Sequence, residues 1–204
     1  MLFANTILRP PSNSEADSGG VSWNGATYQI LGKTEMNETS IQSMKMPVQY
    51  LSCQESRLTY ADGSSRTVYH SDWEVPFPEG LLIVSRTDLR GIITHANDAF
   101  IQISGYRKEE LIGASHCVLR HPDMPKRVFG DLWQTISAGK KWQGYIKNLR
   151  KDGAHYWVFA TVVPNIRAGT VVGYTSVRRQ PAKAKLEAVI ALYRHWIELE
   201  GETE

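Results

Sequence analysis

The sequence predicts an α+β fold built on one five-stranded antiparallel sheet. Three observations predict it: two short apolar strands joined by a turn, several short helices that end at glycine, and three longer strands rich in aromatic and β-branched residues. The predicted strands cover residues 81–85, 92–95, 142–150, 155–166 and 170–178. A chain of 204 residues is long enough for one or two such domains.

The first two strands are joined by a turn at residues 87–91, whose Asp and Gly residues are typical of a hairpin. Asn97 then begins a short helix, because its side chain can accept a hydrogen bond from a free N–H of the first turn. Gly105 ends that helix, and a second helical turn at 108–112 ends at Gly113. Short helices therefore separate the strand pair from the rest of the sheet.

A longer helix is predicted over residues 124–137. Asp123 is expected to cap it, and Pro125 lies in the first turn, where a missing N–H costs nothing. One broad apolar face is formed by Val128, Phe129, Leu132, Trp133 and Ile136. This face is expected to pack against the sheet.

The last three strands are separated by two turns, of which Lys151-Asp152-Gly153 is a tight hairpin signal. A final amphipathic helix is predicted over 182–199. Its apolar stripe needs a partner surface. The stripe consists of Leu186, Val189, Ile190, Tyr193, Trp196 and Ile197.

The first 72 residues show weaker patterns. Residues 10–20 are rich in Pro, Ser and Gly, which is typical of a linker or disordered stretch. Residues 23–31 indicate a short strand or hairpin, and 48–51 and 65–69 are weak strand candidates. We therefore expect a poorly defined or partly disordered extension over 1–72, a folded domain over 73–180 and a C-terminal helix over 181–204.

Composition excludes several classes of protein. The chain is 42% hydrophobic and 22% charged, as in ordinary globular proteins, and its net charge of +2 gives no basis for nucleic-acid binding. No stretch is apolar enough to span a membrane, and the N-terminus lacks the features of a secretory signal. Cys53 and Cys117 are far apart and form no metal-ligand pattern, so we expect a reduced, cytoplasmic setting.

The hexapeptide Arg120-His121-Pro122-Asp123-Met124-Pro125 is the most informative motif. It places a guanidinium, an imidazole and a carboxylate on backbone that two prolines restrict, directly before a helix. Such an arrangement suits an anionic, hydrogen-bonding ligand such as a nucleotide cofactor. The alternative is a solvated ion-pair cluster in a surface turn, which would contribute little.

These motifs resemble a PAS domain, specifically the flavin-binding PAS domain of aerotaxis receptors. The resemblance extends from residue 76 to about residue 179 and implies that residues 73–180 form a PAS sensor domain. It implies a non-covalently held FAD whose redox state reports oxygen or electron-transport status. The residues that carry it are Thr94-His95-Ala96-Asn97-Asp98, Ser104-Gly105-Tyr106, the hexapeptide, Trp142, Lys147-Asn148, Lys151-Asp152-Gly153, His155-Tyr156-Trp157 and Gly173-Tyr174.

The resemblance also implies the binding residues. Asn97, Arg120, His121, Asp123 and Asn148 would bind FAD, with Trp133, Trp142 and Trp157 as aromatic wall or nearby core. The chain departs from the family at Cys117, where Asn is usual, and at Phe159 and Thr161, where Arg and Asn are common. These departures concern the fine hydrogen bonding around the ring.

The chemistry of these side chains fits a flavin. Arg120 offers a planar fork for phosphate or a carbonyl edge, and His121 could donate to phosphate and change its charge near neutral pH. Asn97 and Asn148 each offer a donor and an acceptor for a ring edge that changes protonation on reduction. Structural alternatives stay open: Asn97 as a helix cap, Asn148 as a polar residue of the sheet, and Trp133 as core.

The function expected from the resemblance is a sensor that signals by conformational change to a separate effector, a chemoreceptor or kinase, as a homodimer. We expect Asn148 to reorient when the flavin is reduced, and the sheet to pass the change to the final helix. No nucleophile–base pair or carboxylate pair indicates an enzyme, and no dinucleotide fingerprint indicates a flavoenzyme. The alternatives are a cofactor-free PAS interaction module and a haem-based gas sensor.

Overall fold

The computed structural model describes residues 20–23, 26–29, 53–60 and 63–201. Contacts divide the chain into two compact units, of which one contains residues 49–204 and the other residues 4–48. In the smaller unit, β1 (Gly20–Trp23) pairs antiparallel with β2 (Ala26–Gln29). A hairpin was one of the two predictions for residues 23–31, and the observed hairpin begins slightly earlier.

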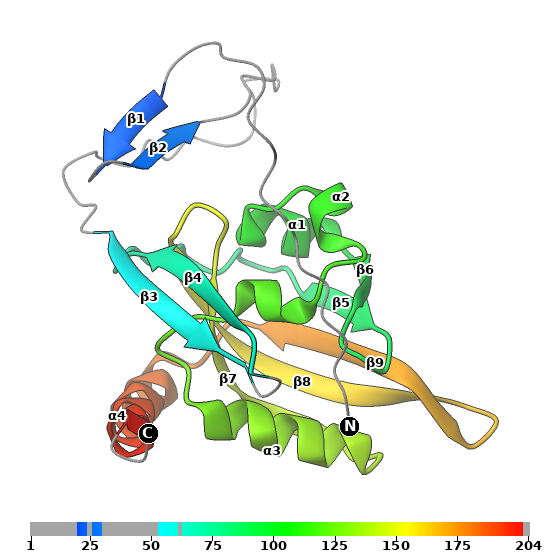
Figure 1. The fold of residues 1–204 in the computed structure, drawn as a ribbon. Coiled ribbons are helices and arrows are strands. Elements are labelled where there is room, and N and C mark those ends of the chain that lie inside the picture. Colours follow the sequence, from blue (N-terminus) through cyan, green and yellow to red (C-terminus); the bar gives the residue numbers. More distant parts are fainter. Residues whose placement is uncertain (1–19, 24–25, 30–52, 61–62, 202–204) are drawn as a thin grey trace. The chain divides into compact units, whose positions relative to one another are not determined.

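A five-stranded antiparallel sheet forms the centre of the larger unit, as predicted. Its strand order is β6-β5-β9-β8-β7 (Figure 1). The pair β5 and β6 therefore joins the three later strands where β5 pairs with β9. The strands are β5 (Ile83–Thr87), β6 (Ile93–Ala96), β7 (Trp142–Leu149), β8 (His155–Arg167) and β9 (Thr170–Arg179).

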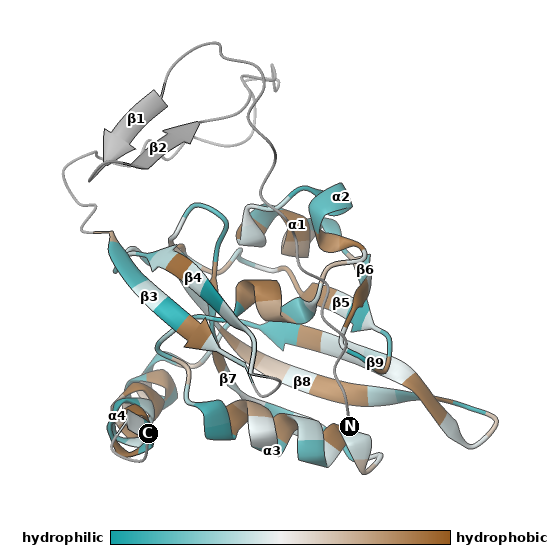
Figure 2. Ribbon diagram, viewed as in Figure 1, coloured by the Kyte–Doolittle hydropathy of each residue, from teal (hydrophilic) through white to brown (hydrophobic). Residues whose placement is uncertain are grey.

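Short helices cover one face of this sheet. They are α1 (Asp98–Ser104), α2 (Lys108–Leu111), a 3-10 helix (His116–Leu119) and α3 (Lys126–Ser137). The first packs against β5, and α3 packs against β7 and β8. Figure 2 shows hydrophobic residues on the central strands and on α3, where the core lies.

The prediction that Asp123 caps the longer helix is wrong. The helix α3 begins at Lys126, two residues later than predicted, and Pro125 is its N-cap residue. The Asp123 carboxylate instead accepts a hydrogen bond from Lys147 Nζ at 2.7 Å. The Asp123 carboxylate therefore pairs with Lys147 on β7 and does not cap the helix.

The C-terminal helix α4 (Lys183–Gly201) packs on the other face of the sheet. Tyr193 is buried, and its hydroxyl donates to the backbone oxygen of Tyr145 on β7 at 2.9 Å. Its ring lies 6.3 Å from that of Trp157 on β8. The predicted apolar stripe therefore finds its partner surface on the sheet.

A second hairpin covers one end of the same face. It is formed by β3 (Gln54–Thr59) and β4 (Ser65–His70), and Leu58 and Val68 form a small core with Leu149. The strand candidate at 65–69 is confirmed as β4, whereas β3 was not predicted and the candidate at 48–51 lies outside the described residues. The division at residue 72 stays a prediction.

Candidate ligand-binding site

The inner face of the sheet, defined as the face covered by α1 and α3, carries polar side chains in its centre. Asn148 on β7 is paired with Tyr156 on β8, and Arg178 on β9 is paired with Ala160 on β8. Paired residues of an antiparallel sheet share a face, and side chains alternate along each strand. Asn148, Tyr156 and Arg178 therefore project from the same face, and all three are buried.

Several polar atoms on this face have no hydrogen-bond partner within the described part of the chain. They are Asn148 Nδ2, Tyr156 Oη, Ser176 Oγ and Arg178 Nη1. A buried polar group left unpaired costs about 1–3 kcal/mol, so native proteins pair nearly all of them. A polar ligand between the sheet and the helices would supply the missing partners.

Arg178 is the charged residue of this group. Its Nη2 donates to Ser85 Oγ at 3.0 Å and to His116 Nε2 at 2.7 Å, and its guanidinium lies 5.2 Å from the Phe100 ring centre. Burial lowers the pKa of Arg178 to about 10. Burial and the Arg178 charge lower the pKa of His116 to about 3, so this imidazole is neutral and accepts the hydrogen bond.

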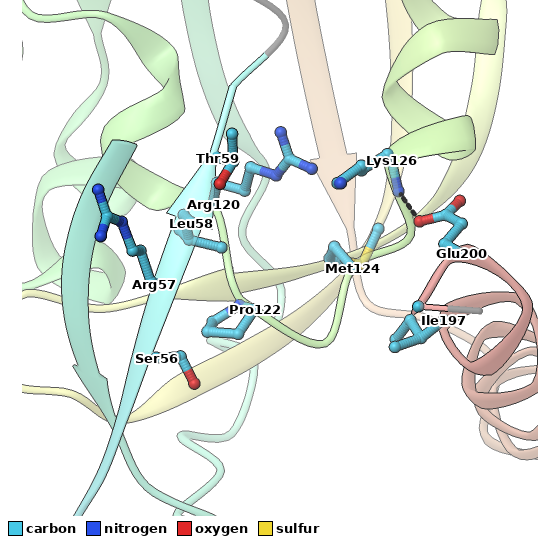
Figure 3. A pocket seen from close by; sticks show the side chains of 11 residues that line it. Ser56, Arg57, Leu58, Thr59, Arg120, Pro122, Met124, Lys126, Ile197 and Glu200 are labelled. Atoms are coloured by element: carbon cyan, nitrogen blue, oxygen red, sulfur yellow. Dashed lines mark hydrogen bonds between the residues drawn. The ribbon is translucent and has the colours of Figure 1, made fainter. Parts of the chain in front are cut away.

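Arg120 lies beside Asn148 at the edge of β7, where an isolated antiparallel bridge pairs the two residues. The guanidinium carbon is 4.9 Å from the Phe129 ring centre and 5.7 Å from that of Tyr60. Its Nε is buried, and no described residue offers it a hydrogen-bond partner. Arg120 also lines an open groove of about 320 Å³ with Ser56, Arg57, Leu58, Thr59, Pro122, Met124, Lys126, Ile197, Glu200 and Gly201 (Figure 3).

His121 is completely buried. Its Nδ1 accepts from the backbone N–H of Asp123 at 3.1 Å, and its ring lies edge-on to those of His70 and His155, at 5.1 and 5.6 Å. Burial and the Lys147 charge lower the pKa of His121 far below its ordinary value. The prediction that its charge changes near neutral pH is therefore wrong. Its buried Nε2 has no hydrogen-bond partner among the described residues.

Asp123 and Lys147 form an ion pair beside His121. Burial acts to raise the pKa of Asp123, but the hydrogen bond and charge of Lys147 outweigh this effect and lower it. The Asp123 side chain is about half exposed and the Lys147 side chain is nearly buried. Because Lys147 and Asn148 are consecutive on β7, this pair lies on the opposite face of the strand from Asn148.

Asn97 acts as the helix cap that the sequence allowed. Its Oδ1 accepts from the N–H of Val84 at 2.9 Å and of Phe100 at 3.1 Å, and its Nδ2 donates to the Leu82 oxygen at 2.8 Å. This side chain therefore joins β5 to α1. Direct contact between Asn97 and a ligand stays a prediction.

The three predicted tryptophans lie in different places. Trp142 shares the inner face and donates from Nε1 to Asp131 of α3 at 2.7 Å. Trp133 is half-buried on α3, with its ring edge-on to Tyr174 at 5.7 Å. Trp157 projects from the opposite face toward Tyr193. The first two therefore lie between the inner face and α3, and the third belongs to the core beneath α4.

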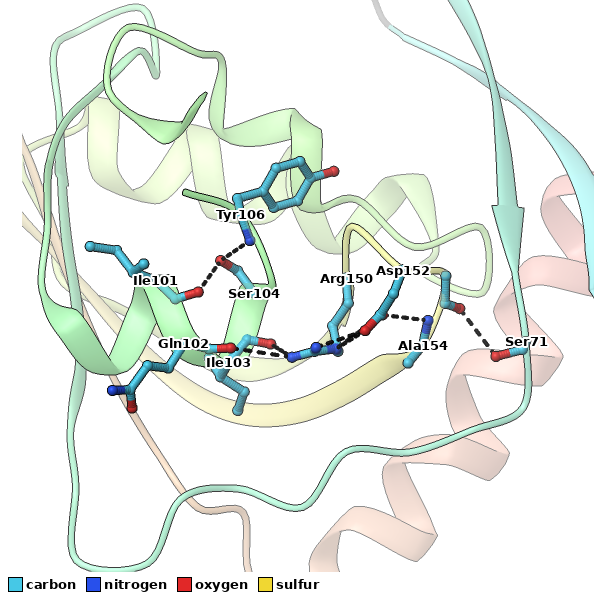
Figure 4. Close-up of polar contacts among 10 residues, drawn as sticks. Ser71, Ile101, Gln102, Ile103, Ser104, Tyr106, Arg150, Asp152 and Ala154 are labelled. Atoms are coloured by element: carbon cyan, nitrogen blue, oxygen red, sulfur yellow. Dashed lines mark hydrogen bonds and ion pairs between the residues drawn. The ribbon is translucent and has the colours of Figure 1, made fainter. Parts of the chain in front are cut away.

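Arg150 holds the turn after β7 against α1 (Figure 4). Its guanidinium donates to the Ile103 oxygen and forms an ion pair with Asp152 at 2.7 Å. The backbone N–H of Lys151 also donates to the Ser104 oxygen at 3.0 Å. These contacts fix the end of β7 that carries Asn148.

The sequence interpretation missed Tyr156, Ser176 and Arg178 as candidate ligand contacts. A signal was available, because Tyr174, Ser176 and Arg178 occupy alternate positions of β9. A charged residue on the side of a strand that also carries core residues is unusual, since unpaired charges are rarely buried. The alternation along β9 therefore indicates that Arg178 is a buried charge and a candidate ligand contact.

Comparison with known proteins agrees with this architecture. Residues 93–178 match a family model described as PAS fold. The chain is 45% identical over 126 residues to the aerotaxis receptor of Escherichia coli. The matched residues cover 62% of this chain and 25% of the receptor. The chain is 30% identical over 97 residues to the nitrogen fixation regulatory protein of Klebsiella pneumoniae, covering 47% of this chain and 20% of that protein.

Among solved structures, the PAS domain of a protein from Colwellia psychrerythraea has 28% identity and a TM-score of 0.46, over 50% of this chain and 87% of that domain. The chain spans a quarter or less of the length of the aerotaxis receptor and the nitrogen fixation regulatory protein. No helix in the described part of the chain is long and apolar enough to cross a membrane. The family match and the antiparallel sheet show that this part of the chain has a PAS fold, and its sequence is similar to part of the aerotaxis receptor.

Proposed function

We propose that the chain is a FAD-binding PAS sensor module for redox, oxygen or energy status. The observation that carries this proposal is the group of buried polar atoms on the inner face for which the described residues supply no hydrogen-bond partner. The matched relatives are a receptor and a regulatory protein, which supports signalling as the role of the domain. Sensing by a bound cofactor needs no catalytic pair, and we propose that the domain is not an enzyme.

The inner face fits the requirements of a flavin. A flavin ring needs apolar surfaces on its faces and hydrogen-bonding groups along its edge. The apolar Phe100 and Val158 are buried beside the polar Asn148, Tyr156 and Arg178. When bound, FAD would supply reversible uptake of electrons, and the protein would set the potential through charge and hydrogen bonds.

Arg120 is the proposed contact for the anionic part of the cofactor. Its Nε has no partner in the part of the chain that the structure describes, and its guanidinium lies where the groove meets the strand that carries Asn148. His121 would act as a neutral donor through Nε2, while Asp123 and Lys147 hold the segment around it. The proposal keeps all the predicted site residues. The residues that would contact FAD are Asn97, Arg120, His121, Asp123 and Asn148, and those that would shape the surrounding core are Trp133, Trp142 and Trp157.

The signal would leave through β7 and α4. Asn148 projects inward, whereas its neighbour Lys147 is paired with Trp157, whose ring lies against Tyr193 of α4. A change at Asn148 can therefore alter the surface on which α4 rests, provided that the two flavin states favour different arrangements. We propose that the receiver is a chemoreceptor or kinase in trans, and that the chain is a cytoplasmic homodimer.

The absorption spectrum of the purified chain tests this function. Yellow protein with flavin bands, or protein that acquires them after incubation with FAD, supports the proposal. Protein that stays colourless after incubation would make the domain a cofactor-free interaction module. A Soret band would indicate haem, and steady turnover of a nicotinamide donor would indicate a flavoenzyme.

A further inference from the structure

Arg178 is a buried cation without an acidic partner in the described part of the chain. Its exposed fraction is 3%, and its polar contacts are the Ser85 hydroxyl and the His116 ring. The other terminal nitrogen, Nη1, contacts no acceptor among residues 20–23, 26–29, 53–60 and 63–201. A buried charge is strongly unfavourable unless an opposite charge or a full set of hydrogen bonds compensates it.

Its neighbours cannot supply the missing negative charge. His116 is neutral, because burial and the charge of Arg178 lower its pKa to about 3. Burial raises the pKa of Tyr156 above its ordinary value, so its phenol stays protonated at neutral pH. Arg178 itself stays charged, because its pKa of about 10 is still well above neutral. The inner face therefore carries a net positive charge at its centre.

We propose that Arg178 balances the negative charge of a ligand on the inner face, and that this ligand is the reduced flavin. This inference rests on the proposed function and adds a residue and a charge state to it. Two electrons from an external reduced quinone or nicotinamide donor, together with one proton from solvent, convert the oxidised ring into a ring with one negative charge. Arg178 keeps its proton and supplies the opposite charge.

Such a charge makes the domain bind reduced FAD more tightly than oxidised FAD. Preferential binding of one redox state moves the reduction potential toward that state, by about 30 mV for each tenfold difference in a two-electron couple. Arg178 would therefore raise the potential at which the sensor responds. Ser85 and His116 would hold the guanidinium in place as neutral acceptors.

Potentials of matched variants test this role. We expect Arg178→Gln, which removes the charge, to lower the preference for reduced FAD at least tenfold, a fall of about 30 mV or more. Arg178→Lys should keep most of the preference. The control is Arg179→Gln, because the adjacent Arg179 lies over the Phe159 ring, projects from the opposite face and should leave the potential unchanged.

The pH dependence of the wild-type potential gives a second test that does not depend on a variant folding. Near pH 6, one proton taken up with two electrons gives a slope of about 30 mV per pH unit, and two protons give about 60 mV. The smaller slope supports an anionic reduced ring. The larger slope, or an unchanged potential in Arg178→Gln with FAD bound, overturns the role of Arg178 and leaves FAD binding intact, whereas absence of FAD binding overturns both.

Discussion

Glu200 of α4 caps the first turn of α3 at Lys126. Its carboxylate accepts from the backbone N–H of Lys126 at 2.7 Å (Figure 3). It also accepts from the backbone N–H of Arg127 at 3.0 Å. The Arg127 side chain also lies over the Trp196 ring at 5.1 Å. Because α3 follows directly from Arg120–Pro125, this contact joins the end of α4 to the candidate site.

Removing this cap should loosen α4. We expect Glu200→Ala to lower the free energy of unfolding by about 1 kcal/mol, because two N–H groups lose a charged acceptor near the positive end of the helix dipole. Urea denaturation measures the loss, and hydrogen exchange shows whether it is concentrated in α4. Glu198→Ala is the matched control, since that side chain is 65% exposed. Equal effects of the two substitutions would show that Glu200 is not a specific cap.

Arg120→Ala should weaken FAD binding and leave the fold intact. Loss of the guanidinium removes a charge-assisted contact, so we expect affinity to fall at least about tenfold, or 1.4 kcal/mol. Fluorescence titration with FAD measures the affinity, and circular dichroism checks the fold. The control is Arg90→Ala, whose side chain is 70% exposed and pairs with Asp88. Unchanged affinity in Arg120→Ala would support the solvated ion-pair interpretation of the hexapeptide.

Acid should destabilise the domain through its buried histidines. Burial, followed by the Lys147 charge, lowers the pKa of His155 from 6.5 to about 4. Between these pH values the unfolded chain binds the proton and the folded chain does not. The contribution of His155 to the free energy of unfolding is therefore complete above pH 6.5 and is lost as the pH falls toward 4. His155 should account for about 1 kcal/mol of the loss between pH 7.5 and pH 5.

Urea midpoints at these two pH values check that direction. The pH dependence should be smaller in His155→Gln, which removes the titrating ring, and unchanged in the control His195→Gln on exposed α4 surface. A His155→Gln protein with the full wild-type pH dependence would assign the effect to other groups.

Two glycines should respond to alanine in opposite directions. At Gly173 an added Cβ would collide with the backbone oxygen of Thr87 on the neighbouring strand. We expect Gly173→Ala to destabilise the fold by about 1–3 kcal/mol or more. At Gly130 in α3 no atom lies within 4 Å of the added Cβ, so Gly130→Ala should stabilise by about 0.5–1 kcal/mol. Thermal unfolding compares them, and a tolerated Gly173→Ala would show that the two strands can separate.

Local sequence determined the elements well but not all their contacts. The cap at Asn97, the end at Gly105 and the three long strands follow from nearest neighbours along the chain, and the structure confirms them. The start of α3 was misplaced because Asp123 pairs with Lys147, a residue distant in sequence. Such competition between a local cap and a distant partner cannot be seen in a local pattern.

The candidate site was predicted only in part for the same reason. The hexapeptide was recognised from its motif, but the complete burial of His121 depends on His70 and His155, which other strands supply. Trp157 resembled an aromatic wall, yet the register places it on the face toward α4. The position of a side chain on one face or the other depends on sheet register, which a single strand does not specify.

The flavin content of the purified chain decides whether this domain binds FAD. After incubation with FAD and removal of free cofactor, we expect about one FAD per chain, identified after denaturation by its absorption and its mass. A protein that is folded by circular dichroism and retains no flavin under these conditions would contradict it.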